Sequence, residues 1–200
     1  MIIAGLTGGV ATGKTTVSRF FQDCGAVLVD ADVLARLVVE PGKPAWRDVV
    51  RTFGKRVLLP DRTVNRPALG DIVFHNQAKL KRLNAIMHPR IAREQARLTR
   101  EIAQKDPEAV VIYDAPLLIE AQAHRRMDRI IVVAADRKIQ IARLQRRSHL
   151  TRVQAVRRVN SQMPLKQKLG MADYVIDGTL TPAQLRHAVT QVYEDLKRLV

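Results

Sequence analysis

The chain has 200 residues, 46% of them hydrophobic, which is enough for a single folded domain that buries about 70% of the surface of its unfolded chain. Its 34 Lys and Arg residues outnumber the 19 Asp and Glu residues by 15, and this positive charge predicts anionic partners such as phosphorylated metabolites or nucleic acid. Because Cys24 is the only cysteine and no apolar run reaches the ~18 residues of a membrane span, the composition excludes a disulfide-bonded scaffold and a transmembrane protein, and we expect a cytoplasmic one.

Five short apolar runs predict the strands of a sheet, and the amphipathic stretches between them predict helices. Each run is continuously apolar rather than alternating, which is typical of strands buried on both faces of a parallel sheet. The alternation of strands and helices predicts a doubly wound α/β fold with right-handed crossovers. The predicted strands are residues 2–6, 26–29, 109–113, 130–134 and 174–176.

Two of the predicted helices have clear boundary signals. After the first strand, Val17 and Phe21 are four residues apart on one apolar face, and Gly25 follows as a stop signal. Near the end of the chain, Thr181-Pro182 predicts an N-cap followed by a proline in the first helical turn. We expect both helices to pack their apolar faces against the sheet.

Two long segments interrupt this alternation. Residues 33–105 have a mostly helical pattern, with breaks expected at 41–44, at 59–61 and at His88-Pro89, because proline favours extended backbone in the residue before it. Residues 137–168 form a basic insert, since 13 Lys and Arg residues and only 2 Asp residues fall between Arg125 and Lys168. We expect both segments to belong to one domain that spans residues 1–200.

A glycine-rich segment after the first strand, Gly8–Thr15, has the G-x-x-x-x-G-K-[ST] spacing of a phosphate-binding loop. Glycines such as Gly8 and Gly9 let backbone amides face a phosphate, and the following helix adds the positive end of its dipole. Lys14 brings a charge to the β- and γ-phosphates, and Thr15 offers a hydroxyl to Mg²⁺. The sequence therefore predicts a site for ATP and Mg²⁺.

Three carboxylates are expected at the edge of the sheet where this loop lies, because each follows a predicted parallel strand. Asp30 and Asp32 come after the second strand, where Asp32 can accept the proton of an acceptor hydroxyl and Asp30 can contact the water shell of Mg²⁺. Asp114 ends the third strand, as in many phosphate-loop enzymes that hold a metal in this way. The alternatives are an N-cap role for Asp32 and a cap or turn for Asp114.

Basic and imidazole side chains add further candidates. Arg143 and Arg147 are four residues apart on a predicted helix of the basic insert, so they share one face and can neutralise a phosphoryl group during transfer. Each can also be an ordinary solvated arginine. His88 can contact an anionic or hydroxyl-bearing substrate, or serve as a structural histidine. Aromatic residues are too few for a base-stacking surface, which argues against nucleic acid as the partner.

Motifs beyond the phosphate loop resemble the dephospho-CoA kinase family. The most specific are Asp-x-Asp-x-x-x-Arg at residues 30–36, His-Pro at 88–89 and Pro-Leu-Leu at 116–118. Further matching elements are residues 83–84, 90–91, 119–120, 143–147, 162 and 172–177. The resemblance runs from Leu6 to about Gly178, with the motifs in the order of the family.

The resemblance implies a phosphate-loop kinase fold with a five-stranded parallel sheet, a helical substrate-binding region within residues 33–105 and a lid over residues 137–168. It implies transfer of the ATP γ-phosphoryl group to the ribose 3′-hydroxyl of dephospho-CoA, the last step of coenzyme A synthesis, with Asp32 as the base. It implies nucleotide contacts from Ala11, Thr12, Gly13, Lys14, Thr15 and Thr16. It implies acceptor contacts from Asp32, Arg36, His88, Pro116, Leu117 and Leu118.

Two positions depart from the family. Gly178 stands where the family usually has Asn, and Ser148 stands where an Asp commonly follows the lid arginine. We therefore expect recognition of the adenine base to depend more on backbone groups of the protein, and we expect activity to be retained. The sequence indicates no oligomeric state.

Three other functions remain open at the level of the sequence. One is another small-molecule kinase with the same core that acts on a nucleoside monophosphate or a sugar. A second is a nucleic-acid-binding ATPase, which the net charge of +15 favours. A third is a scaffold without activity, which would leave Lys14, Thr15 and Asp32 unexplained.

Overall fold

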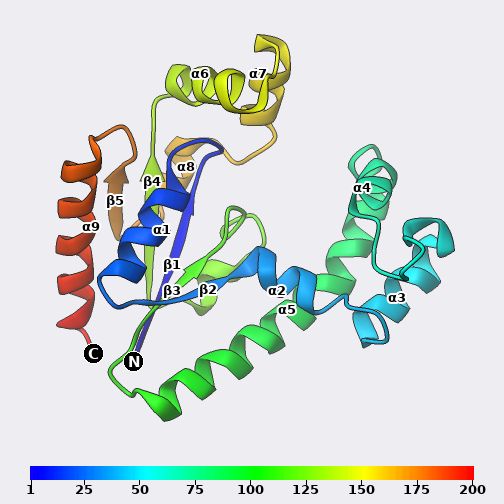
Figure 1. Cartoon of the computed structure of the whole chain (residues 1–200), viewed down its shortest axis with the longest axis horizontal. Helices are drawn as coiled ribbons and strands as arrows, with labels where there is room; N and C mark the ends of the chain where they lie inside the picture. The colour runs from blue at the N-terminus through cyan, green and yellow to red at the C-terminus, as the bar shows by residue number, and fades with distance from the viewer. The chain divides into compact units, whose positions relative to one another are not determined.

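The computed structural model describes all 200 residues and contains one five-stranded sheet in which every strand pairing is parallel (Figure 1). The strand order is β2-β3-β1-β4-β5, which puts β1 at the centre. All five expected strands are confirmed, each within two residues of its expected bounds. They are β1 Ile2–Gly8, β2 Val27–Asp30, β3 Val110–Asp114, β4 Arg129–Ala134 and β5 Tyr174–Asp177.

The chain divides into two compact units. We call Met1–Asp30 with Ile102–Val200 the sheet unit, and Ala31–Glu101 the helical unit. The helical segments, in chain order, are α1 Lys14–Asp23, α2 Ala31–Leu37, α3 Pro44–Phe53, η1 Lys55–Val57, α4 Arg66–Phe74, α5 Gln77–Lys105, η2 Ala123–Arg126, α6 Arg137–Ser148, α7 Arg152–Asn160, α8 Leu165–Leu169 and α9 Pro182–Lys197. None of them has the length and apolar composition that a membrane crossing requires.

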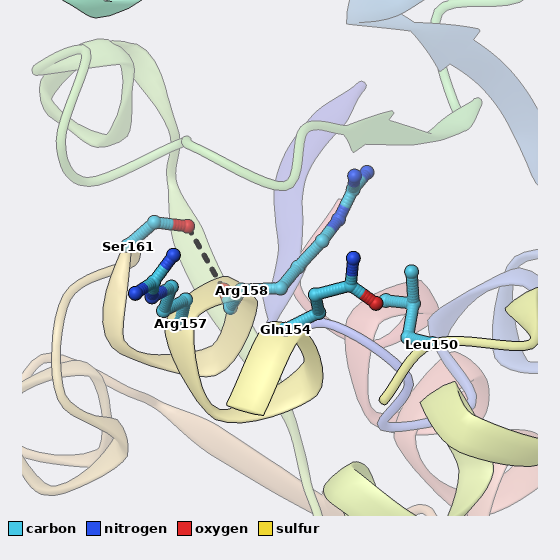
Figure 2. A pocket seen from close by; sticks show the side chains of 5 residues that line it. All are labelled: Leu150, Gln154, Arg157, Arg158 and Ser161. Carbon is cyan, nitrogen blue, oxygen red and sulfur yellow. Dashed lines mark hydrogen bonds between the residues drawn. The ribbon is translucent and has the colours of Figure 1, made fainter. Parts of the chain in front are cut away.

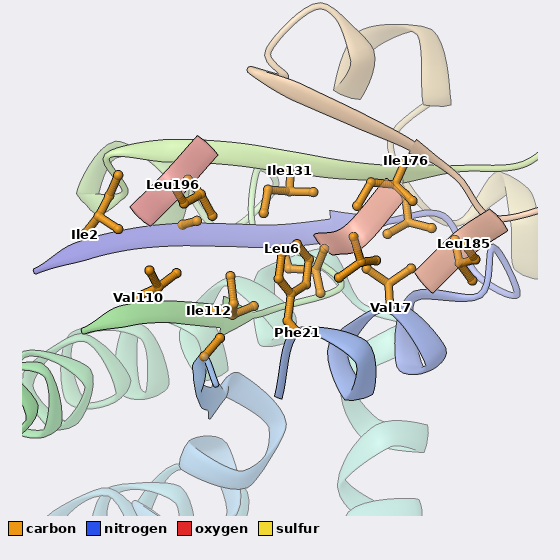
Figure 3. Close-up of a cluster of buried hydrophobic side chains, with 14 residues drawn as sticks. Ile2, Leu6, Val17, Phe21, Val110, Ile112, Ile131, Ile176, Leu185 and Leu196 are labelled. Carbon is orange, nitrogen blue, oxygen red and sulfur yellow. The ribbon is translucent and has the colours of Figure 1, made fainter. Parts of the chain in front are cut away.

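Helices α1 and α9 pack on one face of the sheet and enclose the main hydrophobic core of the sheet unit (Figure 3). Leu6 of β1 packs there with Val17 and Phe21 of α1 and with Leu185 of α9. Burial of side chains of this size contributes roughly 1.5–3 kcal/mol each. This packing fixes the start of α1 against the end of β1, which is where the glycine-rich loop connects them.

The expected helix boundaries in the sheet unit are confirmed. Gly25 follows α1 with a left-handed φ of 102°. Thr181 caps α9 and forms a capping box with Gln184, and proline occupies the first turn. The side chain of Thr181 accepts a hydrogen bond from the backbone amide of Gln184, and the Gln184 side chain accepts one from the amide of Thr181.

The expectation that every strand is buried on both faces is wrong for the two edge strands. Val27 of β2 is 38% exposed and Val175 of β5 is 55% exposed. By contrast, all five residues of β3 are buried. The apolar runs correctly indicated strands, but an edge strand has a neighbour on one side only, so part of its apolar surface stays in contact with solvent.

The expected helix break at His88-Pro89 is also wrong. Pro89 lies inside the continuous helix α5, although proline lacks an amide donor and costs ~3 kcal/mol in a helix interior. The guanidinium of Arg90 donates to the carbonyl of Ile86 at 2.7 Å, which supplies a donor in the turn that proline disturbs. Ile86 and Ile91 pack against the core of the helical unit on either side of this turn, so packing overrides the local preference.

The other breaks in the helical segment are confirmed. Helix α3 begins at Pro44, and residues 59–61 lie between η1 and α4. The helical unit has its own core, which holds Val39, Val49, Val57 and Leu69 among its buried residues. This core joins α3, η1 and α4 to the chain that follows α2.

Candidate functional site

The glycine-rich loop joins the carboxyl end of β1 to the amino end of α1. Gly13 caps α1 with a left-handed φ of 100°, and Ala11 also has a left-handed φ of 59°, which is uncommon for a residue with a Cβ. The amides of Gly13, Lys14 and Thr15 find no acceptor within the protein, as the first turn of a helix leaves them. No acidic residue occupies that turn. The loop therefore presents free amide donors and a helix dipole to an anion.

Side chains from distant parts of the sheet unit hold the loop in this shape. The amide of Val10 donates to Oε1 of Gln162 at 2.7 Å, and Thr12 Oγ1 donates to the carbonyl of Gly9 at 2.9 Å. Arg143 of α6 donates to the carbonyl of Ala11 at 3.2 Å and to that of Gly178 at 2.9 Å. The basic insert is thus attached to the loop at two points, Arg143 in its first helix and Gln162 after its second.

Gly178 approaches the loop so closely that only glycine fits there. A Cβ at this position would lie 1.8 Å from the carbonyl oxygen of Thr12 and 3.0 Å from a methyl of Val133. The turn after β5 therefore packs its backbone directly on the phosphate loop. This contact gives a physical reason for the glycine that departs from the family pattern.

Next to this turn, Asp177 accepts hydrogen bonds from the Thr179 hydroxyl at 2.7 Å and from the Thr179 amide at 2.8 Å. These bonds hold the pKa of Asp177 below its ordinary value, and the charge of Arg143 acts more weakly in the same direction. The carboxylate therefore stays ionised beside the loop.

The ammonium of Lys14 forms an ion pair with the Asp114 carboxylate, and the Ser18 hydroxyl donates to the same carboxylate. Asp114 and Ser18 are buried. Asp114 is paired in register with Asp30 of the neighbouring strand, so both carboxylates stand at the carboxyl edge of the sheet, as expected. Lys14, Asp114 and the loop thus lie together, which supports a phosphate site next to a carboxylate.

The phosphate loop has few side chains nearby that could serve as ligands of a magnesium ion. Thr15 is exposed at the start of α1, and no group of three or more His, Cys, Asp or Glu side chains could hold a metal by itself. Magnesium typically keeps several waters and uses one or two protein groups together with substrate phosphates. A hydroxyl at Thr15 and a carboxylate at Asp114 fit an ion of this kind that arrives with a nucleotide.

A buried ion pair fixes the segment after β3. The ammonium of Lys168 in α8 is completely buried, pairs with Glu120 at 2.9 Å and donates to the carbonyl of Pro116 at 3.0 Å. Glu120 also accepts from the amide of Met163 at 3.1 Å. In this segment Leu117 is 50% exposed, whereas Leu118 is completely buried.

The two arginines that the sequence singled out in the basic insert differ in environment. Arg143 is engaged by the backbone of the phosphate loop, as described above, whereas Arg147 is exposed and makes no hydrogen bond or ion pair. A hollow of about 360 Å³ lies further along the insert and is lined by Leu150, Gln154, Arg157, Arg158 and Ser161. Figure 2 shows that the side chains of Arg157 and Arg158 extend in different directions from α7. Exposed arginines lie on α7 (Arg152, Arg157, Arg158) and at the end of α6 (Arg146, Arg147).

The remaining candidate residues belong to the helical unit. Asp32 lies in the first turn of α2 and Arg36 in its last turn, and both are exposed. His88 is exposed on α5. The structure thus assembles the loop, Asp114, Arg143 and the Pro116–Leu118 segment in the sheet unit, and it carries Asp32, Arg36 and His88 in the helical unit.

Sequence reasoning missed several residues that shape these regions. Lys168 lies in a basic stretch that looks like a solvated surface, and its partner Glu120 is 48 residues earlier in the chain. Ser18 belongs to no motif of the predicted helix after the loop. Its position four residues after Lys14, which places both on the same helix face, was the signal that could have indicated it. Arg66, the first residue of α4, carried no motif at all.

Comparison with known proteins agrees with these features. The model of the dephospho-CoA kinase family matches residues 2–182. The chain is 46% identical to a dephospho-CoA kinase of Geobacter metallireducens over 196 residues, which cover 98% of this chain and 96% of the relative.

Two solved structures are also similar. A crystal structure of TT1252 from Thermus thermophilus has a TM-score of 0.81 and 30% identity, with 97% of each chain covered. A dephospho-CoA kinase from Campylobacter jejuni has a TM-score of 0.64 and 22% identity, covering 97% of this chain and 96% of that one, and supports the fold alone. From the family match over nearly the whole chain, which includes the phosphate loop, we conclude that this chain belongs to the dephospho-CoA kinase family.

Proposed function

We propose that the protein transfers the γ-phosphoryl group of ATP to the ribose 3′-hydroxyl of dephospho-CoA, giving coenzyme A and ADP. The observation that carries this proposal is the extent of the family match, which includes both the phosphate loop and the whole helical unit. A phosphate loop alone would specify only the donor nucleotide, whereas a match across both units also covers the region that distinguishes acceptors.

On the donor side, the free amides of Gly13, Lys14 and Thr15 bind phosphate oxygens without any rearrangement of the loop. The Lys14 ammonium leaves Asp114 for the β- and γ-phosphates and stabilises charge that spreads over the transferred group. Magnesium bound with ATP would be held by Thr15 and, through water, by Asp114, and it would neutralise charge on the phosphates. Contacts from Gly8, Gly9, Ala11, Thr12 and Thr16 complete the proposed nucleotide site.

On the acceptor side, we assign Asp32 as the base that orients the 3′-hydroxyl and takes its proton. Support comes from chain connectivity: Asp32 lies two residues after Asp30, which ends β2 in register with Asp114. The acceptor contacts proposed are Arg36, His88 and Pro116 to Leu118. Within that last segment, half-exposed Leu117 is the side chain with apolar surface available to a ligand.

The basic insert has two parts in this mechanism. Arg147, exposed and unpaired, supplies positive charge to the phosphoryl group in transfer. Arg143 acts by fixing the carbonyl of Ala11 and thereby the direction of the loop amides. We expect this reaction to take place in the cytoplasm, where ATP is available.

The test is an assay with ATP, Mg²⁺ and dephospho-CoA that couples ADP release to a spectroscopic signal, followed by mass measurement and NMR of the product. We expect one added phosphate, located at the 3′ position. A panel containing AMP, adenosine and a hexose as acceptors, with ATP held constant, separates this function from other small-molecule kinases. Preference for AMP would contradict the proposal, and stimulation of ATP hydrolysis by DNA or RNA would favour a nucleic-acid-dependent ATPase. Lys14→Ala is the inactive control.

A further inference from the structure

A small pocket in the helical unit is lined by two arginines that sequence reasoning did not bring together. Its volume is about 200 Å³, and its lining includes Arg36, Val39, Pro41, Val64 and Arg66, together with Glu40 and Thr63. Complete small-molecule sites usually measure roughly 300–1,000 Å³. This pocket therefore suits one charged group of a larger ligand rather than a whole ligand.

The walls of the pocket are fixed by the fold. On the Arg66 side, a bridge between Leu58 and Val64 closes a tight loop, and the amide of Asn65 donates to the carbonyl of Val57 at 2.8 Å. Asn65 then caps α4 by accepting from the amide of Ala68, which makes Arg66 the first helical residue. Arg66 is thus held near the positive end of a helix dipole.

The Arg36 side is equally well supported. Val38 and Val39 are buried in the core of the helical unit, and that core also contains Val57 and Leu69 from the opposite side of the pocket. The amide of Val39 donates to the carbonyl of Arg36 at 3.2 Å, which continues the turn at the end of α2. One hydrophobic core therefore sets the spacing of the two arginine backbones.

No ion pair within the protein neutralises the charge of the two arginines. Neither Arg36 nor Arg66 forms a hydrogen bond or ion pair with a carboxylate. Glu40, the acidic residue of the lining, pairs instead with Lys43 at 2.8 Å. The Thr63 hydroxyl donates to Asp61 at 2.6 Å and is therefore also engaged. Two neighbouring arginines without an ion-pair partner favour binding of an external anion.

The electrostatics of Arg66 agree with this description. Burial lowers the pKa of Arg66, the nearby charge of Arg36 lowers it further, and Asp32 acts in the opposite direction with the smallest effect. The two guanidinium groups thus repel each other in the free protein. An anion between them removes that repulsion and forms charge-assisted hydrogen bonds to both.

We infer that Arg66 and Arg36 together bind the diphosphate group of the acceptor nucleotide, with Arg66 as a specificity residue that no sequence motif indicated. The inference rests on the proposed function, which supplies an acceptor that carries one diphosphate. Planar guanidinium groups match phosphate oxygens in pairs, and two of them match the two phosphates of a diphosphate. The phosphates of ATP are the alternative anion for this arginine pair, but the loop in the sheet unit already offers hydrogen-bond donors to them.

The central experiment measures the Kd of dephospho-CoA by calorimetry, without ATP, for the wild type and for Arg66→Gln. We expect the variant to bind dephospho-CoA about 10- to 100-fold more weakly, since a hydrogen-bonded charge partner is lost. The matched control is Arg56→Gln, which removes the same charge from an exposed residue of the same unit outside the pocket. Circular dichroism and the Tm check that both variants fold.

Three further arms distinguish the sources of the anion. Steady-state kinetics should give a raised KM for dephospho-CoA, with the KM for ATP and kcat within about 2-fold of the wild type. Adenosine as acceptor carries no phosphate, so its low kcat/KM should not fall further in Arg66→Gln. Arg66→Lys should recover only part of the loss, because an ammonium cannot make the paired contacts of a guanidinium.

The outcomes separate failure of this inference from failure of the proposed function. If the wild type does not phosphorylate dephospho-CoA, the proposed function fails. If the wild type does so and Arg66→Gln binds dephospho-CoA as tightly as Arg56→Gln does, the inference is overturned while the function stands. A rise in the KM for ATP alone would also overturn it, because the pocket would then serve the donor.

Discussion

The lysines Lys14 and Lys168 of the sheet unit and the pocket arginines Arg36 and Arg66 of the helical unit differ in whether a carboxylate pairs with them. In the sheet unit, Lys14 and Lys168 are paired with carboxylates that are themselves held by further donors such as Ser18. In the helical unit, Arg36 and Arg66 line a pocket and form no ion pair. The completely buried Lys168 therefore holds a fixed geometry, while the two pocket arginines are available for a ligand. Substitutions at the Lys168–Glu120 pair should therefore affect stability, and substitutions at Arg66 should affect binding of the acceptor.

The largest expected effect tests the helical unit. Asp32→Asn should lower kcat by about 10²- to 10⁴-fold, because the amide cannot accept the proton of the acceptor hydroxyl. Its free energy of unfolding should change by less than ~0.5 kcal/mol, since Asp32 is exposed. The measurements are steady-state kinetics and urea unfolding, with Asp71→Asn as an exposed control on the same unit. Unchanged turnover in Asp32→Asn would remove this residue from the mechanism.

A second prediction compares one ion pair from each unit. Glu120→Gln should destabilise the fold by about 3–5 kcal/mol, because it leaves the fully buried Lys168 ammonium without a counter-charge. Asp48→Asn removes the partner of Arg90, but both of those side chains are more than a fifth exposed, so we expect a loss of about 1 kcal/mol or less. Urea unfolding measures both values.

The double variant Glu120→Gln/Lys168→Met provides the control for this comparison. It removes the buried charge together with its partner, so it should recover part of the stability lost in Glu120→Gln. Equal losses in Glu120→Gln and Asp48→Asn would contradict the contrast between the units.

A third prediction concerns the close contact of the sheet unit. Gly178→Ala should cost about 1–3 kcal/mol of stability and raise the KM for ATP, because its Cβ would overlap the carbonyl oxygen of Thr12 in the phosphate loop. Gly170→Ala is the matched control, since a Cβ there would have its nearest contact at 3.6 Å. Thermal unfolding and ATP titration provide the readouts. A Gly178→Ala protein with the properties of Gly170→Ala would show that the turn is free to move.

The smallest expected effect concerns the titration of Asp177 and Asp61, which occupy two turns with the same hydrogen bonds. In each unit a carboxylate, Asp177 or Asp61, accepts from the hydroxyl and amide of a threonine two residues later, and its pKa is lowered. A lowered folded pKa contributes stability at pH above about 4, and the contribution is lost as the pH falls through that folded value. Thr179→Val and Thr63→Val should each raise only the neighbouring carboxyl pKa toward 3.8, as NMR titration would report.

After these substitutions, the two carboxyl groups should differ in how far their pKa values stay lowered. Arg143 also lowers the pKa of Asp177, whereas no cation acts on Asp61. Asp177 in Thr179→Val should therefore keep a residual, salt-sensitive lowering that Asp61 in Thr63→Val lacks. Identical residual values in both variants would remove Arg143 from the electrostatics of the loop.

The sequence predicted features that depend on local pattern. Apolar runs indicated all five strands, and the spacing of Gly8–Thr15 indicated the phosphate loop and the helix after it. It did not predict the exposure of Val27 and Val175, because strand order decides which strands are edges. Pro89 was misread because a local helix-breaking preference was outweighed by packing on both sides of it.

Features that depend on contacts between distant residues could not be predicted. The burial of Lys168 depends on Glu120 and on the carbonyl of Pro116, which no local pattern connects to it. The requirement for glycine at position 178 depends on the backbone of Thr12, far away in the chain. The structure places the site residues, but their roles in binding and catalysis remain predictions, and Asp32→Asn tests that of Asp32.

The basic insert is attached to the phosphate loop at two points, which limits the part of the insert that a lid movement could involve. Arg143 anchors the middle of α6 to the carbonyl of Ala11, and Gln162 anchors the chain beyond α7 to the amide of Val10. If the insert closes over a nucleotide, we expect the segment between these anchors to move while the loop keeps its shape. A donor nucleotide would meet a loop already in its final shape, while the segment that carries most of the exposed arginines adjusts to it.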